Sequence, residues 1–292
     1  NMFHALEDIV KQCTATHLPM WKVILQEDCK ESGMEEVAAL EKMKGMYDAM
    51  KASIAAYDPS MLSNSGLVGQ EAGILQKRID RQEMLSGSFI SNVMEKALRV
   101  AGCNACMKRI VASPTAGSCG VLPAVLVAYQ ETKSVSEQKM VEALLIAGGI
   151  GGVIGHRASL SGAQGGCQAE IGSASSMAAG ALAYLEGGDE QCILNASAFA
   201  LKNLLGLACD PVAGLVEVPC VKRNVMGAVN AVTSCDMAMA GITSRIPADE
   251  VIDAMGAIGA HMPLEIKETG IGGLAGTPTG KNIARKMSVE TR

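Results

Sequence analysis

Between residues 161 and 224 the chain reads Ser161-Gly-Ala-Gln-Gly-Gly-Cys167-Gln168, then Gly206-Leu-Ala-Cys209-Asp-Pro211, then Val218-Pro-Cys220-Val-Lys-Arg-Asn224. Each cysteine stands near glycine or proline, where the backbone can turn sharply and bring a thiolate close to a ligand. Thiolates are the usual ligands of iron–sulfur clusters. We therefore expect Cys167, Cys209 and Cys220, here called the site cysteines, to hold a [4Fe–4S] cluster by three corners and to leave the fourth iron open.

The composition around these segments favours helices. The 292 residues include 32 glycines and 18 methionines, whereas aromatic residues make up only 3%. Strands prefer β-branched and aromatic residues, but the helix formers alanine, leucine, methionine, glutamate and lysine dominate here. Small side chains let helices approach closely, and methionine fills irregular gaps between them. The sequence therefore predicts an all-α protein, a multi-helix bundle whose core helices are rich in Gly, Ala and Met.

Charge and hydropathy exclude several classes of partner. The net charge of −5 offers no basic surface to nucleic acid or to an anionic membrane. No apolar run reaches the roughly 18 residues of a membrane span, and the longest, near residues 141–154, is interrupted by Glu142 and by glycines. We find no secretory signal, so we expect a cytoplasmic protein. Its ten cysteines should then be free thiols or metal ligands rather than disulfides.

Helical periodicity divides the chain into two parts. Residues 3–27 and 33–56 are predicted to form two amphipathic helices. In the second, apolar residues from Val37 to Ile54 recur at steps of three or four. We expect residues 1–60 to form a helical hairpin packed on a helical catalytic domain, residues 61–292, within one structural domain. A docking surface for another chain is the alternative role of the hairpin.

Further helices are predicted in the second part, and the site cysteines fall at their ends. The helices cover residues 87–100, 121–130, 137–154, 167–186, 191–207, 224–242 and 247–259. Cys167 opens one helix, Cys209 follows another and Cys220 precedes a third. Helix starts and nearby N–H groups stabilise thiolates. The segment 268–292 is expected to be partly mobile.

Hydroxyl groups and glycines crowd into Ser113-Pro-Thr-Ala-Gly-Ser-Cys-Gly120, directly before a predicted helix. Free N–H groups and the positive dipole end at a helix start suit a carboxylate or a phosphate. The same residues would equally serve as an N-cap and a tight turn. A Cys-x-x-Cys pair, Cys103 and Cys106, has no second pair or histidines to complete a zinc site, so we expect two ordinary thiols.

Three motifs carry a family resemblance. They are Ser-Pro-Thr-Ala-Gly-Ser-Cys-Gly from residue 113, Ser-Gly-Ala-Gln-Gly-Gly-Cys-Gln-Ala-Glu-Ile-Gly-Ser-Ala from residue 161, and Leu-Gly-Leu-Ala-Cys-Asp-Pro-Val-Ala-Gly-Leu-Val-Glu-Val-Pro-Cys-Val-Lys-Arg-Asn from residue 205. Together they resemble the α subunit of iron–sulfur-dependent L-serine dehydratase, an L-serine ammonia-lyase. The resemblance extends over about residues 65–280.

This resemblance implies a ligand set and partners. The site cysteines would be the cluster ligands, the catalytic domain would be all-α, and L-serine would be the substrate. A separate β subunit with an ACT-like fold would complete the enzyme, and we expect contacts between copies of this chain. Some single-chain relatives end in a cysteine that can occupy the open iron. The last cysteine here is Cys235, so that feature is not carried over.

The expected mechanism starts from the poor leaving group of serine. An open iron would act as a Lewis acid on the hydroxyl, and a base would remove the α-proton. For the substrate carboxylate the first choices are Ser113, Thr115, Gly117 and Ser118, and the second choices are Ser161, Lys222, Arg223 and Asn224. Lys222 and Arg223 could instead tune the cluster potential or be solvated. The base stays open among His156, His261, Lys77 and a group of the partner subunit.

Three rival functions are distinguishable in principle. A related cluster lyase, such as an L-cysteine desulfidase, would use the same three thiolates on another β-substituted amino acid. A pyridoxal-phosphate dehydratase would need a Schiff-base lysine, and no suitable context surrounds Lys77 or another lysine. A non-catalytic iron–sulfur sensor would have no reason to leave an iron open.

Overall fold

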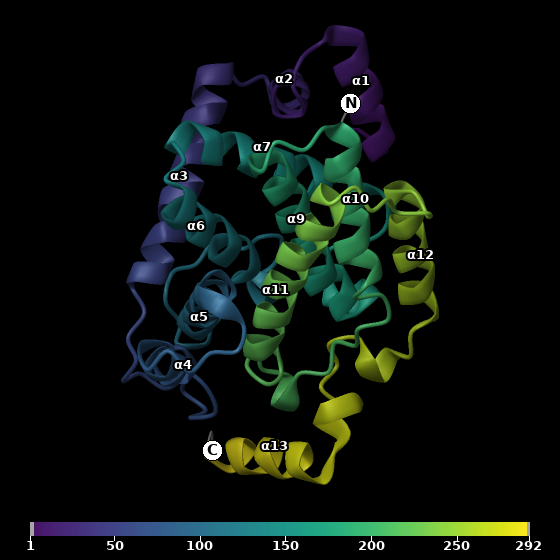
Figure 1. Cartoon of the computed structure of the whole chain (residues 1–292). Coiled ribbons are helices and arrows are strands. Elements are labelled where there is room, and N and C mark those ends of the chain that lie inside the picture. Colours follow the sequence, from purple (N-terminus) through teal and green to yellow (C-terminus); the bar gives the residue numbers. More distant parts are fainter. Residues whose placement is uncertain (1–2, 291–292) are drawn as a thin grey trace.

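The computed structural model describes residues 3–290, and this range is helical with no β-strand (Figure 1). An isolated bridge between Cys209 and Lys267 is its one β-type pairing. The helices are α1 Leu6–Thr16, α2 Met20–Ser32, α3 Glu36–Ala55, α4 Glu71–Asp80, α5 Gly87–Ala105, α6 Val121–Lys133, α7 Glu137–Arg157, α8 Gly162–Gly165, α9 Ser173–Leu185, α10 Glu190–Lys202, α11 Cys220–Met239, α12 Ala248–His261 and α13 Pro278–Glu290. The predicted all-α class is confirmed.

Short helical segments of other types join these helices near the site. They are the 3-10 helices η1 Ala116–Ser118, η3 Val212–Gly214, η4 Leu264–Ile266 and η5 Gly273–Gly276, and the π-helix η2 Gln168–Gly172.

Helix α9 lies at the centre of the bundle, against α6, α7, α10 and α11 (Figure 1). Its residues from Ser173 to Ala183 are all buried, because alanine, serine and glycine leave room for neighbours on every side. A Cβ at Gly180 would overlap the side chain of Ile150 on α7. The Ser176 hydroxyl also bonds the backbone carbonyl of Ser197 on α10 at 2.9 Å. The small residues predicted for the core therefore allow the neighbouring helices to pack closely against α9.

The N-terminal segment differs from the predicted hairpin. Residues 6–32 form two helices, since His17 takes a left-handed conformation at φ 57° and Pro19 precedes α2. A residue before proline disfavours the helical conformation, so the chain breaks at Leu18. The core is continuous from Leu6 to Met255, so α1, α2 and α3 share it with the later helices.

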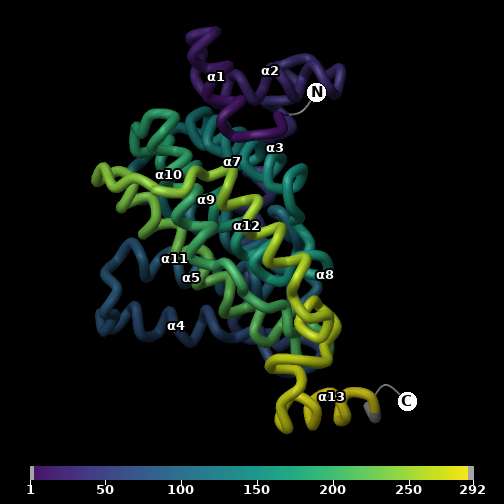
Figure 2. Tube along the Cα trace, turned by 90° about the vertical axis from the view of Figure 1, so that its right-hand side faces the viewer, coloured from purple at the N-terminus to yellow at the C-terminus, as the bar shows by residue number. Residues whose placement is uncertain are grey.

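The C-terminal segment is more regular than expected. Residues 278–290 form α13, with proline at its first position, a favoured place for that residue. The Thr277 hydroxyl accepts a hydrogen bond from the Gly280 N–H at 3.1 Å, as an N-cap does. Helix α13 lies at the opposite end of the molecule from α1 and α2 (Figure 2) and packs on η3 and η5.

Helix α7 contains the longest apolar run. Within the described residues it is the one helix long and apolar enough to cross a membrane, and 61% of its most apolar window is buried inside the protein. It packs against α2, α3 and α9, so its apolar residues have a place in the core.

Candidate functional site

The site cysteines occupy three differently built backbone positions. Cys167 follows Gly166, whose φ of 73° turns the chain after α8, and it precedes the π-helix η2. Cys209 lies in the loop after α10, held on both sides by backbone bonds from its N–H to the Ile266 carbonyl and from the Glu268 N–H to its own carbonyl, at 2.9 and 2.8 Å. Cys220 is the first residue of α11. The prediction of a helix end therefore holds for Cys167 and Cys220, whereas Cys209 lies in a loop seven residues after the end of α10 at Lys202.

The three thiols are brought close enough for their charges to interact. Burial is the main cause that raises the pKa of each, to about 12 for Cys167 and about 11 for Cys220. For Cys209 burial comes first, and the neighbouring Cys167, Glu170 and Cys220 raise the pKa further. The site cysteines, which are 42 and 11 residues apart in the sequence, thus lie together in one region where thiol and carboxyl groups gather.

Arg223 supplies the positive charge beside the thiols. Its guanidinium donates to the carbonyl of Ala208 at 2.7 Å and to the Asp210 carboxylate at 2.8 Å. It lowers the pKa of Cys167 and of Cys220 against the effect of burial. The ion pair is largely buried, with 17% of the Arg223 and 6% of the Asp210 side chain exposed. Arg223 therefore both anchors the Cys209 loop and favours thiolates.

The donors at this site are thiols, the ligand type that iron–sulfur clusters use. No group of three His, Cys, Asp or Glu side chains within residues 3–290 is arranged to hold a metal ion. All three site cysteines are free thiols, and the backbone N–H of Ile171 points at the sulfur of Cys167, a kind of bond that tunes cluster sulfurs.

The Ser113–Gly120 loop lies against the start of α11. Thr115 and Ser118 bond each other's hydroxyl and backbone groups around η1, so the capping alternative describes part of this loop. The Gly120 N–H donates a hydrogen bond to the side-chain oxygen of Asn224 at 2.9 Å. Ser113 and Ser118 are buried, while Gly117 is half-buried and lies next to Glu170. The structure thus brings this loop and the site cysteines together.

Sequence reasoning missed Glu170. Its carboxyl accepts hydrogen bonds from Thr115 and, at 3.8 Å, from the thiol of Cys209. Burial raises its pKa, Glu268 raises it further, and the two hydrogen bonds lower it. The residue lies on η2, and π-helical turns occur often at functional sites. Its position three residues after Cys167 in the second motif was the only signal available beforehand.

The remaining predicted residues are more dispersed. Lys222 is exposed and pairs with Glu71 at 3.2 Å, whereas Ser161 is the N-cap residue of α8. His156 pairs with His4, and the Nδ1 of His261 bonds the Ala257 carbonyl. His156, His261 and Lys77 are all exposed, and no hydrogen bond within residues 3–290 links them to the site cysteines or to Glu170. Their roles stay predictions.

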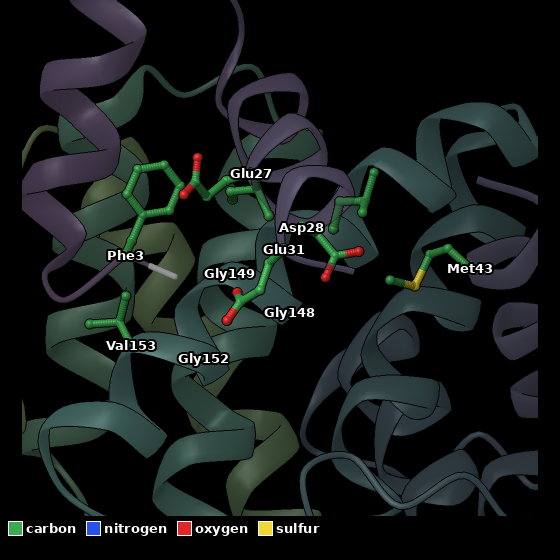
Figure 3. Close-up of a pocket in the computed structure, with 11 residues that line it drawn as sticks. Phe3, Glu27, Asp28, Glu31, Met43, Gly148, Gly149, Gly152 and Val153 are labelled. Carbon is green, nitrogen blue, oxygen red and sulfur yellow. The ribbon is translucent and has the colours of Figure 1, made fainter. Parts of the chain in front are cut away.

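Two further features lie apart from this site. Cys103 is buried and donates to the Ser53 carbonyl at 3.3 Å, while Cys106 is half-buried. A cavity of about 180 Å³ lies between α2 and α7, lined by Glu27, Asp28 and Glu31 on one side and by glycines of α7 on the other (Figure 3). None of its lining residues belongs to the candidate site.

Comparison with known proteins points to one family. The family model described as serine dehydratase alpha chain matches residues 15–275. The probable L-serine dehydratase alpha chain of Bacillus subtilis is 44% identical over 286 residues, which are 98% of this chain and 95% of that one. The L-serine dehydratase alpha chain of Peptoniphilus asaccharolyticus is 39% identical over 99% of both chains. The L-serine dehydratase of Haemophilus influenzae is 36% identical over 92% of this chain but only 60% of its own length.

Proposed function

The chain belongs to the serine dehydratase alpha chain family, and from this premise we propose that it converts L-serine to pyruvate and ammonia as the α subunit of an iron–sulfur-dependent enzyme. The observation that carries the proposal is the meeting of three free thiols, buried at Cys167 and Cys209 and half-buried at Cys220, with Arg223 beside the Ser113–Gly120 loop. Elimination of water from serine yields aminoacrylate, which tautomerises and hydrolyses to pyruvate and ammonia.

In this proposal Cys167, Cys209 and Cys220 hold a [4Fe–4S] cluster. When bound, the cluster supplies a Lewis-acidic iron without a protein ligand, which turns the substrate hydroxyl into a better leaving group. Arg223 offsets the negative charge that three thiolates bring into a buried place. The N–H of Ile171 supports the sulfur of Cys167.

The chain's other residues bind and orient the substrate. The hydroxyl groups of Ser113, Thr115 and Ser118 and the backbone of Gly117 are the proposed partners of the carboxylate, because they lie in the loop that Asn224 holds against α11. Ser161, Lys222 and Arg223 are secondary candidates. Asn224 acts through the loop, since its amide is engaged with backbone groups. Because His156, His261 and Lys77 are exposed, we propose that the general base comes with the partner chain.

The partners follow from the same premise. We propose a β subunit with an ACT-like fold, contacts between copies of this chain, and a cytoplasmic location. Two relatives carry the words "alpha chain" in their names, which supports an enzyme of more than one kind of chain.

The test combines metal analysis with turnover. The chain would be reconstituted without oxygen, and iron, acid-labile sulfide and pyruvate release from L-serine measured with and without the co-produced β subunit. About four irons and four sulfides per chain are expected, with pyruvate formed when β is present. A cluster with turnover of L-cysteine instead of L-serine would identify a desulfidase. A cluster with no turnover of either would indicate a sensor, and no iron or sulfide would refute the cluster site.

A further inference from the structure

Glu170 lies where the three parts of the candidate site meet. The residue is carried by η2, directly after Cys167. Its carboxyl bonds Thr115 of the Ser113–Gly120 loop and contacts the thiol of Cys209. No other carboxylate within residues 3–290 bonds both the loop and a site cysteine. Anything held between the loop and these cysteines would lie close to this group.

Two glycines bring the backbone close to the carboxyl of Glu170. A Cβ at Gly162 would come within 2.7 Å of its Oε2 and 2.9 Å of the Cys209 sulfur. A Cβ at Gly117 would touch Oε1 at 3.5 Å. The carboxyl therefore lies directly against the start of α8 and the Ser113–Gly120 loop, next to the Cys209 sulfur.

The carboxyl also has acceptor capacity to spare. A carboxylate offers about four lone-pair positions. Thr115 engages one of them, and the bond from the Cys209 thiol is lost when that thiol is deprotonated to bind iron. Glu268 lies near enough to repel the same carboxylate, and Arg223, the cation beside the site cysteines, is committed to Asp210 and Ala208. A buried negative charge of this kind is stabilised by a cation that donates hydrogen bonds. An ammonium group has three such donors.

We propose that Glu170 binds the ammonium group of the substrate and thereby restricts the site to α-amino acids. The inference rests on the proposed function and adds a third point of recognition to it. The Ser113–Gly120 loop takes the carboxylate and Glu170 takes the ammonium, while the cluster, when bound, would supply the Lewis acid for the hydroxyl. Hydroxy acids that lack the ammonium would leave Glu170 without its partner.

Matched ligand pairs test this inference. L-alanine and propionate differ in the ammonium alone, as L-serine and 3-hydroxypropionate do, and neither L-alanine nor propionate has a hydroxyl to eliminate. Binding of L-alanine and propionate would be measured by calorimetry on the reconstituted holoenzyme. The variants are Glu170→Gln, which keeps the shape without the charge, and Glu170→Asp. The control is Glu265→Gln, since Glu265 is exposed in η4. Iron content would be determined for each preparation.

In Glu170→Gln, L-alanine should bind at least about ten-fold more weakly, as expected for a lost charged hydrogen bond, while propionate should bind within about two-fold of wild type. The kcat/KM for L-serine should fall, and inhibition by 3-hydroxypropionate should persist in any variant that retains turnover. Glu170→Asp should be intermediate, and Glu265→Gln should match wild type.

Equal weakening of both ligands would overturn the inference in favour of a structural role. So would unchanged binding of both, or loss of iron from both Glu170 variants. The proposed function fails separately. A wild-type holoenzyme that carries its cluster and releases no pyruvate would refute the function, while a selective loss of L-alanine binding in Glu170→Gln would still support the ammonium site.

Discussion

Asn224 accepts a hydrogen bond from the backbone N–H of Gly120, 104 residues earlier in the chain, at 2.9 Å. Its amide nitrogen donates to the carbonyls of Gly117 and Cys220 at 2.8 and 2.9 Å. One buried side chain therefore fastens the Ser113–Gly120 loop to the first turn of the helix that begins with a site cysteine. The relative position of loop and cysteine depends on this amide.

Asn224→Ala should uncouple the loop from α11. The variant leaves three backbone groups without their partner, and such losses cost about 1–3 kcal/mol. Urea unfolding should show this loss. Pyruvate formation should fall by more than ten-fold at equal iron content, because the loop is no longer held in position beside Cys220.

Asn230→Ala is the matched control. Asn230 lies on the same helix and donates to Ser175 and to the Ala200 carbonyl at 2.9 and 2.8 Å, away from the loop. It should lose comparable stability but keep the kcat of wild type. If both variants lose activity in parallel, the effect comes from stability, and the positioning role of Asn224 is disproved.

Serine in place of Cys167, Cys209 or Cys220 should abolish cluster and turnover together, since an alcohol is a far weaker iron ligand than a thiolate. Cys106→Ser should retain the iron and sulfide of wild type, because Cys106 is half-buried in the separate Cys-x-x-Cys pair. The measurements are iron and sulfide content and the visible spectrum after anaerobic reconstitution. Full iron in any one of the three site variants would remove that residue from the ligand set.

Gly162→Ala should damage the site through one methyl group. The added Cβ would come 2.7 Å from Glu170 and 2.9 Å from the Cys209 sulfur, so one of them must move. Cluster loading and kcat/KM should both decrease. The matched control is Gly148→Ala on α7, where a Cβ meets nothing within 4 Å. That variant should gain about 0.5–1 kcal/mol of stability, the usual helix preference for alanine over glycine, with turnover unchanged. A fully active Gly162→Ala enzyme would mean that the close packing of Gly162 against Glu170 and Cys209 is not needed for turnover.

Arg223 and Asp210 should behave as a coupled pair in the chain without a cluster. Arg223→Met leaves the Asp210 carboxylate buried without its cation, and breaking a buried pair in this way costs about 3–5 kcal/mol. Asp210→Asn in the Arg223→Met background should restore part of this loss, because a neutral amide needs no cation. Urea unfolding of the two single variants and the double variant would give the coupling energy, expected at about 0.5–3 kcal/mol. Additive effects would show that the pair contributes no mutual stabilisation.

The confirmed predictions rest on properties of individual residues and of short stretches of sequence. Few aromatics and many small helix formers indicate an all-α bundle, because the preference for helix and the closeness of helix contacts are properties of the residues themselves. Glycine and proline beside Cys167 and Cys220 correctly place these two residues at helix ends, while Cys209 lies in the loop after α10. The motifs identify the family for the same reason, since they are read directly along the chain.

Helix boundaries were less predictable where one residue overrides a periodic pattern. His17 in a left-handed conformation and Pro19 divide the segment predicted as residues 3–27, although the apolar spacing continues through it. At the other end, Thr277 and Pro278 start α13 in a segment whose composition indicated mobility. Propensity averaged over a window does not register single capping residues.

The sequence alone determined the fold class and the family, and it singled out three thiols as predicted ligands, because composition and contiguous motifs are local properties. Only the tertiary structure revealed that Glu170 reaches Thr115, that Asn224 fastens Gly120, and that Arg223 is committed to Asp210. The contacts to Thr115 and Gly120 join residues 55 and 104 positions apart. No pattern along the chain specifies which distant groups meet, since that depends on how whole helices pack around α9.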